Sequence, residues 1–600
     1  MDSIEELVSL HSVQLRVSGI PEMYWVSLIR KVVDDVYDGN EFFSVNEIQS
    51  DSGVSRFEAI TTRELDSSNE SNIFLIDNWW TFEIKSMRHI LSTNHNVLSR
   101  VETVIGLHPN QNSSSHSRIN DVFSEMWRFV RCYTIQSGAT PEDRESVWYF
   151  MDQFGSSVTH SDEPNAEIRT FIFQPTGVSY SLLWPLKNID SGDLVTRDYL
   201  SGAELNSILW KNVKLYPWTR SLDISSLSLI RHSYDYEDIA SHREEDVAGL
   251  ELEELSSPTL NLPLNVFTDD PTVLKCLTHP NFKLVDFIEN ANIIWIATHF
   301  KGFRKAVNNH QFINQFPGEY LLTCKDLLAS LAEKQNKDSL FPPWFQESYN
   351  LYYNLPLFAQ TFLERANKGE DNTWIMKPWN LGRALSSYVS NSLDQIIRLT
   401  DIHVPLAAFK YIEHPVLIER PNIGGVKFDY RICVLLKSVN PLSLAAHHIV
   451  WLRFANQKFM LSNFDEYTRH FTVMNYVEDH LLDMNYFDFI KLFNSLYPDY
   501  GWDRLLKDSH QAIRELFVKA CQGRGYPFGL MNLPNSRALY GIDMMAKWTE
   551  DNTKMQPVIL EVNFNQDSIR ACKHFPSYFN DIFNYLFLDQ NNDGKFIKIE

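Results

Sequence analysis

The sequence has few cysteines, and none of its six stands in a C-x-x-C pair. This scattered spacing excludes a structural zinc site or a disulfide framework of the usual kind. The sequence also lacks an apolar run approaching the roughly 18–20 residues that cross a bilayer. Its first ten residues, MDSIEELVSL, are acidic and have neither the basic region nor the apolar core of a secretory signal. We therefore expect a cytoplasmic protein, with the nucleus as an alternative compartment, and no membrane partner.

Positive charge is scarce as well, because 54 Lys and Arg residues face 76 Asp and Glu residues, a net charge of −22. This balance argues against a general binder of nucleic acid or of anionic membranes. The 44% hydrophobic and 22% charged residues are those of an ordinary globular protein. A length of 600 residues is too great for one core and gives a prior of roughly four domains, although two or three larger ones fit equally well.

The first half of the chain changes in character along its length. Residues 1–60 predict an N-terminal helical segment, with Trp25, Leu28, Ile29, Val32 and Val33 at helical spacing after Pro21. From Val147 onward, short β-like runs dominate. Residues 231–255 then carry nine acidic side chains against two arginines. Such a run repels itself, so we expect an extended acidic linker over 231–264.

Two phrases in the β-rich part resemble the signatures of SET-domain methyltransferases. Residues 159–166 (THSDEPNA) resemble NHSCxPNA, and residues 192–199 (GDLVTRDY) resemble GEELTYDY. The resemblance implies a SET-like domain over 61–230. The family's cofactor-holding Asn is Thr159 here, its Cys is Asp162, and the first Tyr of TYDY is Arg197, so only Tyr199 matches the catalytic tyrosine. We expect a SET-like shape without methyl transfer; the alternative is an unrelated β-rich domain with chance matches.

Near the C-terminus, two strand-like runs of residues 538–548 and 557–565 are joined by a polar loop. Strict alternation in the second run places Ile559 and Glu561 on one face and Leu560 on the other. Paired as a hairpin, the runs bring Asp543, Glu561 and Asn563 together. Two carboxylates and an amide oxygen are the hard ligands that Mg²⁺ prefers. The alternative is that acidic residues on a half-buried hairpin simply face water.

Cations precede this hairpin at strand-like positions. Lys377 ends a strand at Pro378, where it can reach a phosphate as a point charge. Residues 409–418 resemble a strand, a hinge and a second strand. Lys427, Asp429 and Arg431 share one face of a further strand, and Arg453 follows downstream. These cations, followed by three residues with metal-type oxygens, favour phosphate chemistry over isolated surface ion pairs.

The order of these phrases resembles the tubulin–tyrosine ligase-like family. Counterparts of FPG…KD.L, I.KP, KY.E.P.L, KFDIR, a following Arg, G.D and EVN all occur in sequence over 265–590. The resemblance implies an α+β and α/β multidomain protein, in which an ATP-grasp domain follows the SET-like domain and a tail of 591–600 ends the chain. It implies ATP contacts at Lys377, Lys410, Tyr411 and Asp429, reaction-centre arginines at Arg431 and Arg453, and Mg²⁺ ligands at Asp543, Glu561 and Asn563.

Active members of that family form an acyl phosphate from a protein carboxylate and let an amine attack it. The resemblance therefore implies ATP and Mg²⁺ as cofactors and tubulin or microtubules as the partner. Other tubulin-modifying enzymes and a histone are further candidate partners, and nucleic acid is not expected. The sequence gives no oligomerisation signal.

Two departures affect the expected activity. Active members follow KP with a glycine-rich RGxGI loop, whereas residues 378–387 (PWNLGRALSS) hold one glycine among bulky neighbours. The family's LTN phrase is Phe471-Thr472-Val473. We therefore expect a ligase-like protein that is non-catalytic or weakly active; the alternatives are an active ATP-dependent amino-acid ligase and a SET-type methyltransferase. Residues 589–600 also match a calcium-loop pattern, although a polar tail fits equally.

Overall fold

The computed structural model describes residues 3–48, 55–109, 113–136, 138, 143–200, 207–222, 231–232, 234–250, 258, 261–333, 340–379, 381, 386–402, 404–472, 484–522, 525–564, 566, 568–591 and 594–600. The chain forms two compact units. Unit 1 comprises residues 1–229, 355–371 and 390–404, and unit 2 comprises residues 230–354, 372–389 and 405–600. Each unit is therefore built from more than one stretch of the sequence.

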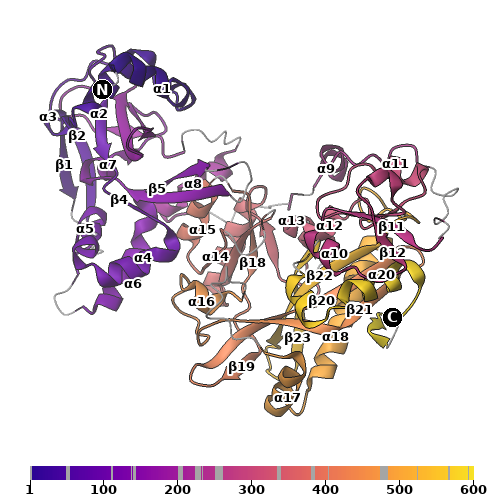
Figure 1. Ribbon diagram of the computed structural model, residues 1–600. Helices are drawn as coiled ribbons and strands as arrows, with labels where there is room; N and C mark the ends of the chain where they lie inside the picture. The colour runs from indigo at the N-terminus through magenta and orange to yellow at the C-terminus, as the bar shows by residue number, and fades with distance from the viewer. Residues whose placement is uncertain are drawn as a thin grey trace. The chain divides into compact units, whose positions relative to one another are not determined.

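Unit 1 combines short helices with small sheets (Figure 1). Its helices are α1 (Ile4–Val17), η1 (Glu22–Tyr24), α2 (Trp25–Val33), α3 (Gly39–Phe42), α4 (Ile84–Thr93), α5 (His95–Ile105), α6 (Ser115–Glu125), η2 (Met126–Arg128), α7 (Gln153–Ser157), α8 (Ile208–Thr219), α14 (Leu355–Lys368), α15 (Leu393–Leu399) and η6 (Thr400–Ile402). Its strands are β1 (Phe43–Ile48), β2 (Arg56–Thr61), β3 (Phe74–Asp77), β4 (Trp80–Phe82), β5 (Val130–Gln136), β6 (Arg144–Phe150), β7 (Thr159–His160), β8 (Ala166–Phe173), β9 (Val178–Pro185) and β10 (Thr196–Arg197).

The N-terminal helices form for local reasons that the sequence carries. Ser3 and Glu6 form a reciprocal capping box at the start of α1, which satisfies two backbone N–H groups. In α2, the predicted apolar stripe is confirmed for Trp25, Leu28, Ile29 and Val32, which are buried, whereas Val33 is exposed. The buried stripe packs in one apolar cluster with Phe171 and Leu182 from β8 and β9. The predicted helical segment of residues 1–60 also contains strand β1 and most of strand β2.

The two SET-like phrases lie side by side in unit 1. Strand β7 pairs in parallel with β10, so that Thr159 is opposite Thr196 and His160 is opposite Arg197. The predicted β runs are confirmed as β6, β8 and β9, of which β8 and β9 form an antiparallel pair and β6 joins β4 and β5. The structure thus joins two segments that are about thirty residues apart in the sequence.

Unit 2 is larger. Its helices are α9 (Tyr236–His242), α10 (Pro271–Cys276), η5 (Ile288–Asn290), α11 (Phe303–Asn308), α12 (Tyr320–Thr323), α13 (Lys325–Ala332), α16 (Tyr467–His470), α17 (Tyr486–Leu496), α18 (Trp502–Gln522), α19 (Ile569–His574) and α20 (Tyr578–Leu588). Its strands are β11 (Leu264–Thr268), β12 (Phe282–Leu284), β13 (Ile293–Trp295), β14 (Phe312–Ile313), β15 (Ser348–Asn350), β16 (Trp374–Pro378), β17 (Tyr388–Ser390), β18 (Leu406–Lys410), β19 (Leu417–Arg420), β20 (Gly424–Ser438), β21 (Ser443–Phe454), β22 (Ala538–Trp548), β23 (Met555–Phe564) and β24 (Phe596–Lys598).

Three sheets organise unit 2. A parallel sheet has the order β12-β11-β13-β14, a second sheet has the order β15-β18-β16-β17, and an antiparallel sheet has the order β23-β22-β20-β21-β24 with β19 beside β20. Helix α10 follows β11; Asp270 caps its N-terminus and Pro271 follows as the first helical residue.

The two faces of the antiparallel sheet are covered differently. Ile432, Val434 and Ile542 pack in one cluster with Ile513 and Phe517 of α18. The alternate residues Cys433 and Leu435 pack in another cluster with α20 and the parallel sheet. Side chains alternate along a strand, so Arg431 and Asp429 of β20 lie on the same face as Cys433. They lie outside the part of that face that α20 covers. That uncovered end of the face holds the candidate site.

The acidic stretch differs from the extended linker that its charge predicts. Residues Tyr236–His242 form α9, and Ala240 and Val247 are buried. The carboxylate of Glu245 accepts two hydrogen bonds from the backbone N–H of Gly318, at 3.2 and 3.3 Å. Burial raises the pKa of Glu245 to about 7. Tertiary contacts therefore hold part of this segment against unit 2, and the extended interpretation is wrong for its described residues.

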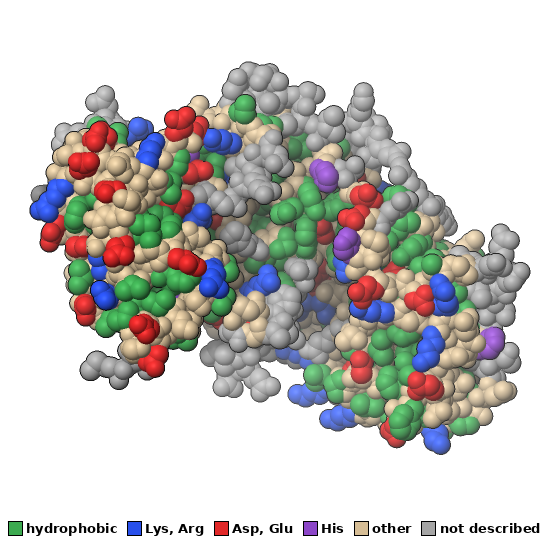
Figure 2. Space-filling model, turned by 90° about the horizontal axis from the view of Figure 1, so that it is seen from above, with side chains coloured by type: hydrophobic (Ala, Val, Ile, Leu, Met, Phe, Trp, Pro, Cys, Tyr) green, Lys and Arg blue, Asp and Glu red, His purple; other side chains and the backbone are tan. Residues whose placement is uncertain are grey.

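Helices of the described chain are too short or too polar to cross a membrane. On the face drawn in Figure 2, acidic and basic side chains are interspersed over both units. The negative net charge is therefore not gathered into one field on that face.

Candidate functional site

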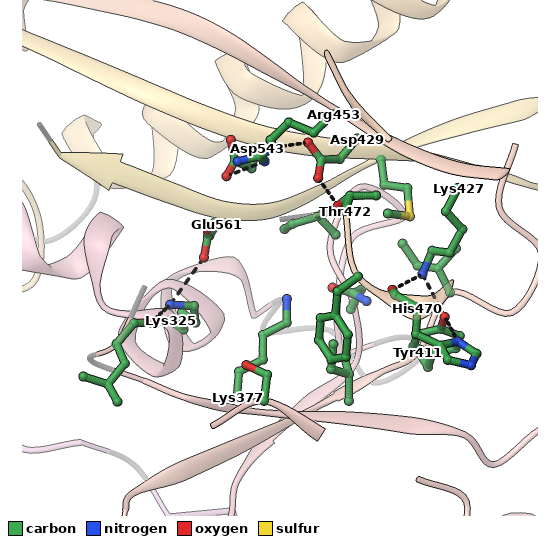
Figure 3. A pocket seen from close by; sticks show the side chains of 18 residues that line it. Lys325, Lys377, Tyr411, Lys427, Asp429, Arg453, His470, Thr472, Asp543 and Glu561 are labelled. Atoms are coloured by element: carbon green, nitrogen blue, oxygen red, sulfur yellow. Dashed lines mark hydrogen bonds and ion pairs between the residues drawn. The ribbon is translucent and has the colours of Figure 1, made fainter. Parts of the chain in front are cut away.

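A cavity in unit 2 lies between the antiparallel sheet and strand β16, with α13 at one end (Figure 3). It encloses about 730 Å³, part of which is open to solvent. Its lining combines charged, polar and apolar side chains: Lys325, Gln346, Ile375, Lys377, Leu381, Ser387, Tyr411, Ile412, Lys427, Asp429, Arg453, His470, Phe471, Thr472, Asp543, Met545, Leu560 and Glu561.

The floor of the cavity is built by strand register. Arg431 on β20 lies opposite Asp543 on β22, and Asp429 lies opposite Arg453 on β21. On the far side of β22, Asp543 lies opposite Glu561 of β23. Directly opposite residues in an antiparallel pair are close enough for their side chains to interact. The sheet therefore gathers onto one face the charged residues that the sequence predicts there.

Asp543 is the centre of a buried ion-pair network. Its exposed fraction is 1%, and Nε and Nη2 of Arg431 donate to its two carboxylate oxygens at 2.6 and 2.8 Å. Arg453 Nη2 lies 2.8 Å from the same carboxylate, and Arg453 Nε donates to Asp429 at 2.6 Å. Burial alone would raise the pKa of Asp543, but the two arginines outweigh it and hold the pKa below its usual range.

Asp429 is enclosed in the same network. Thr472 Oγ1 donates to its second carboxylate oxygen, so both oxygens have partners. Burial nevertheless raises the pKa of Asp429, with Arg453 opposing the shift. The arginine at position 453 thus bridges two carboxylates, and these raise its own pKa despite its burial.

A β-bulge shapes the other edge of the floor. The register of β22 and β23 shifts between Asp543 and Met544, so that Leu560 is an extra residue in β23. Both Leu560 and Glu561 consequently line the cavity, while Ile559 packs in the core under α18. The strict alternation predicted for this strand is wrong at that point. Bulges commonly re-aim side chains beside functional sites, and here one places an apolar and an acidic group next to each other.

The three predicted metal ligands come together. The Asn563 amide nitrogen donates to Asp543 Oδ2 and to Glu561 Oε1, each at 3.2 Å. Glu561 also lies 3.3 Å from the ammonium of Lys325. Within the described residues, no group of three His, Cys, Asp or Glu side chains is placed to hold a metal ion. The Mg²⁺ set therefore stays a prediction: it would need the Asn563 amide to turn its oxygen inward, and phosphate oxygens to complete the shell.

Lys377 projects from β16 into the open middle of the cavity (Figure 3). Its ammonium lies 5.5 Å from the centroid of the Phe409 ring, and no ion pair holds it within the described part of the chain. Burial lowers the pKa of Lys377, with Glu561 opposing the shift. A half-buried cation without its own carboxylate is well placed to receive an anionic ligand.

A second polar cluster lies at the opposite end of the cavity. Lys427 Nζ donates to the Tyr411 hydroxyl at 2.8 Å and to the His470 carbonyl at 3.2 Å. The Tyr411 hydroxyl lies 2.9 Å from Nδ1 of His470, whose Nε2 lies 3.1 Å from the Ser462 carbonyl. This pattern fixes His470 with its proton on Nε2. Burial, aided by Lys427, lowers the pKa of His470 to about 4, and burial lowers the pKa of Lys427 to about 7.

Of the two neighbouring residues predicted to contact ATP, Lys410 and Tyr411, only Tyr411 lines the cavity. Tyr411 lines the cavity beside the apolar residues Ile412, Met545 and Leu560. Lys410 does not line it, because its ammonium binds Glu413 at 2.9 Å and the Thr373 carbonyl at 3.0 Å. The structure therefore does not bring the Lys410 side chain to the site.

Sequence reasoning passed over Lys325 and His470. Lys325 begins α13, donates to the Leu381 carbonyl at 2.7 Å and pairs with Glu561. The only signal for it was the Lys-Asp phrase after Phe316-Pro317-Gly318, which gives no indication of contact with residues more than two hundred positions later. His470 carried no motif at all.

Some predictions lie outside the described residues. These are Asn380 and residues 382–385 of the predicted phosphate loop, Val473, and Asn592 and Asp593 of the calcium-like tail. In the described part of that tail, Asp589 pairs with Lys437 and the Asn591 side chain binds the backbone of Phe596.

The SET-like residues of unit 1 make contacts with neighbouring residues. Asp162 is exposed and lies 2.5 Å from Lys211 and 3.2 Å from His160. The Tyr199 hydroxyl donates to the Val158 carbonyl at 3.1 Å. Thr159, in the place of the family's cofactor-holding Asn, is part of β7.

Comparison with known proteins agrees with this architecture. The model of the tubulin-tyrosine ligase family matches residues 303–595, and the model of the tubulin tyrosine ligase SET-like domain matches residues 49–222. Human tubulin–tyrosine ligase-like protein 12 is 38% identical over 98% of this chain and 94% of its own length. The Caenorhabditis elegans protein of that name is 30% identical over 98% and 97%. Human tubulin polyglutamylase TTLL5 is 29% identical over 32% of this chain and 14% of its own length.

The chain belongs to the tubulin–tyrosine ligase family. It carries a SET-like domain followed by an ATP-grasp-like ligase domain, as the sequence motifs predict.

Proposed function

We propose that this protein binds ATP in the unit 2 cavity and regulates tubulin modification as a non-catalytic or weakly active member of its family. The observation that carries the proposal is the charge of the cavity. Among its described lining residues, four lysine or arginine side chains face three carboxylates, and Lys377 has no carboxylate partner. In a chain of net charge −22, this local excess favours a polyanion.

The rest of the lining fits the other parts of a nucleotide. Ile375, Ile412, Met545 and Leu560 form an apolar end beside Tyr411, suited to a flat base. Lys377 and Lys325 lie toward the other end, suited to phosphates. Glu561 and Asn563, with Asp543, would hold a divalent cation there, and the cation would neutralise charge on the phosphates.

Weak catalysis follows from the sequence of the phosphate loop. The stretch 378–387 contains one glycine, and bulky side chains hinder the close backbone approach that phosphates require. Tubulin is the proposed partner, because relatives such as the polyglutamylase are named for acting on it. Bound to tubulin, such a protein would compete with genuine ligases.

The test has two parts. The purified full chain is incubated with ATP, Mg²⁺ and tubulin, together with labelled tyrosine, glutamate or glycine in turn. We expect no product above background, and we expect the chain to slow a genuine ligase when it is added in excess. Rates like those of active relatives would contradict the proposal.

The second candidate function is an ATP-dependent amino-acid ligase with an unusual acceptor. The convergence of Lys377, Asp429, Arg453, Asp543 and Glu561 in one cavity favours it. A defined product that disappears in the Glu561→Ala variant would establish this function in place of the first.

A further inference from the structure

Two arginines in unit 1 lie against the tyrosine of the SET-like phrase. The Cζ of Arg131, on β5, lies 5.0 Å from the Tyr199 ring centroid and 5.6 Å from that of Trp218. The Cζ of Arg197, on β10, lies 4.9 Å from the Tyr199 ring. The rings of Tyr199 and Trp218 are themselves 4.5 Å apart. Aromatic faces thus fix two guanidinium groups around one side chain.

Neither guanidinium has a polar partner among the described residues. Nε and Nη2 of Arg131 and Nε of Arg197 are enclosed without a hydrogen bond. Arg197 is 7% exposed, whereas Arg131 is half-buried. Burial lowers the pKa of both groups, and Arg197 lowers that of Arg131 further. Arginine nevertheless remains protonated in proteins, so the charges persist.

Arg398, in the same unit, is an example of a buried arginine whose guanidinium nitrogens have hydrogen-bond partners. Its Nε binds Asp401 at 2.7 Å, and its Nη1 and Nη2 donate to the carbonyls of Trp127 and Val130 at 2.5 and 2.9 Å. It also lies over the Trp218 ring, at 4.7 Å. Stacking on an aromatic ring therefore accompanies hydrogen bonding here and does not replace it.

The neighbouring carboxylates are engaged by other cations. Asp401 binds Lys214 and Arg398, and Asp162 binds Lys211 and His160. Glu167 lies 3.3 Å from Arg169; its charge raises the pKa of Arg197, but it forms no ion pair with that guanidinium. A buried donor without a hydrogen bond is costly and requires a physical explanation.

We propose that Arg131 and Arg197 form a binding site for an oxyanion, the phosphate or carboxylate group of a small molecule, beside Tyr199 and Trp218. The guanidinium fork donates in one plane to two oxygens of such a group. The site stands where a methyltransferase of the SET type would use its tyrosine, and Arg197 itself replaces a tyrosine of that phrase. It is independent of the nucleotide cavity, which belongs to unit 2.

The test is calorimetric titration of the full chain with inorganic phosphate, at constant ionic strength in chloride buffer. Because phosphate can also enter the nucleotide cavity, the titration uses the Lys377→Ala chain as its background. We expect saturable binding in that chain, weakened at least tenfold by Arg197→Gln or Arg131→Gln and unchanged by Arg169→Gln. Acetate in place of phosphate distinguishes a carboxylate site from a phosphate site by which ion binds more tightly.

The proposal is overturned if the Lys377→Ala chain binds neither ion in the millimolar range, or if Arg197→Gln binds as tightly as its parent. Should the glutamine variants fail to fold, Arg197→Lys decides, because it keeps the charge and loses the planar fork. We then expect weaker binding with an unchanged melting temperature, and an unchanged affinity would overturn the proposal.

Discussion

Arg431 binds Asp543 through two parallel hydrogen bonds, from Nε at 2.6 Å and from Nη2 at 2.8 Å, in the floor of the unit 2 cavity. Arg453 approaches the same carboxylate at 2.8 Å. One buried carboxylate therefore contacts two guanidinium groups, and removal of its charge would leave Arg431 without its paired carboxylate and Arg453 with Asp429 alone.

We expect Asp543→Asn to lower the free energy of unfolding by about 3–5 kcal/mol, the usual effect of breaking a buried ion pair on one side. The measurement is urea unfolding of the full chain, followed through the transition of unit 2. The matched control is Asp488→Asn on α17, whose carboxylate is exposed and pairs with Lys491 at 3.2 Å. A surface pair contributes about 0–1 kcal/mol, so equal losses in the two variants would contradict the account.

The same ion pairs predict that the stability contributed by Asp543 is lost at acidic pH. The arginines hold the pKa of Asp543 below the unfolded value of about 3.9. A carboxyl shifted in this direction contributes its stability above the unfolded pKa and loses it as pH falls through the folded one. The difference in stability between wild type and Asp543→Asn should therefore be full at pH 6 and shrink progressively below pH 4. A difference that stays constant down to pH 2 would show that the charge of Asp543 is not what stabilises the floor.

The lowered pKa of Lys427 predicts that the protein takes up a proton when it binds an anionic ligand. Its pKa is about 7 because it is buried, so it is largely neutral at pH 8. An anion in the cavity favours the charged form and raises this pKa. Calorimetric titration with ATP at pH 8, in two buffers of different ionisation enthalpy, should show proton uptake that approaches one proton and disappears at pH 6. Lys427→Met should abolish it, and equal heats in both buffers for the wild type would contradict this role.

Unit 1 should not bind S-adenosylmethionine. Thr159 replaces the asparagine that the SET family uses for the cofactor, and the Tyr199 ring is covered by Arg131 and Arg197. Equilibrium dialysis with labelled S-adenosylmethionine should give no saturable binding at millimolar concentration. Binding that is lost on Tyr199→Phe would instead restore the methyltransferase interpretation.

Much of the site could be predicted because it depends on strand periodicity. Alternation alone places Asp429 and Arg431 on one face, and hairpin pairing brings Asp543 to Glu561. The bulge at Leu560 could not be predicted, because an extra residue in a strand leaves no mark in the hydrophobic pattern. Nor could Lys325, because its contact with Glu561 depends on how helix α13 packs across the cavity.

The acidic segment fails as a prediction for a different reason. The prediction from charge assumed that water solvates every carboxylate in the segment. In the structure, Glu245 accepts a hydrogen bond from the backbone N–H of Gly318, and Ala240 packs against Tyr320 and Leu327. Lys410 and Lys377 likewise look alike in the sequence as lysines on or beside strand ends. Only the structure separates them, because Glu413 binds one and not the other.

The most direct test of nucleotide binding is calorimetric titration of the full chain with Mg²⁺ and ATP, comparing wild type, Lys377→Ala and Lys410→Ala. We predict saturable binding in the wild type, a loss of at least tenfold in Lys377→Ala, about 1.4 kcal/mol or more, and no change in Lys410→Ala. The first lysine projects into the cavity and the second is paired with Glu413 outside it. Absence of binding at millimolar ATP, or equal losses in the two variants, would contradict the nucleotide site and leave a protein whose function lies in its contacts with other proteins.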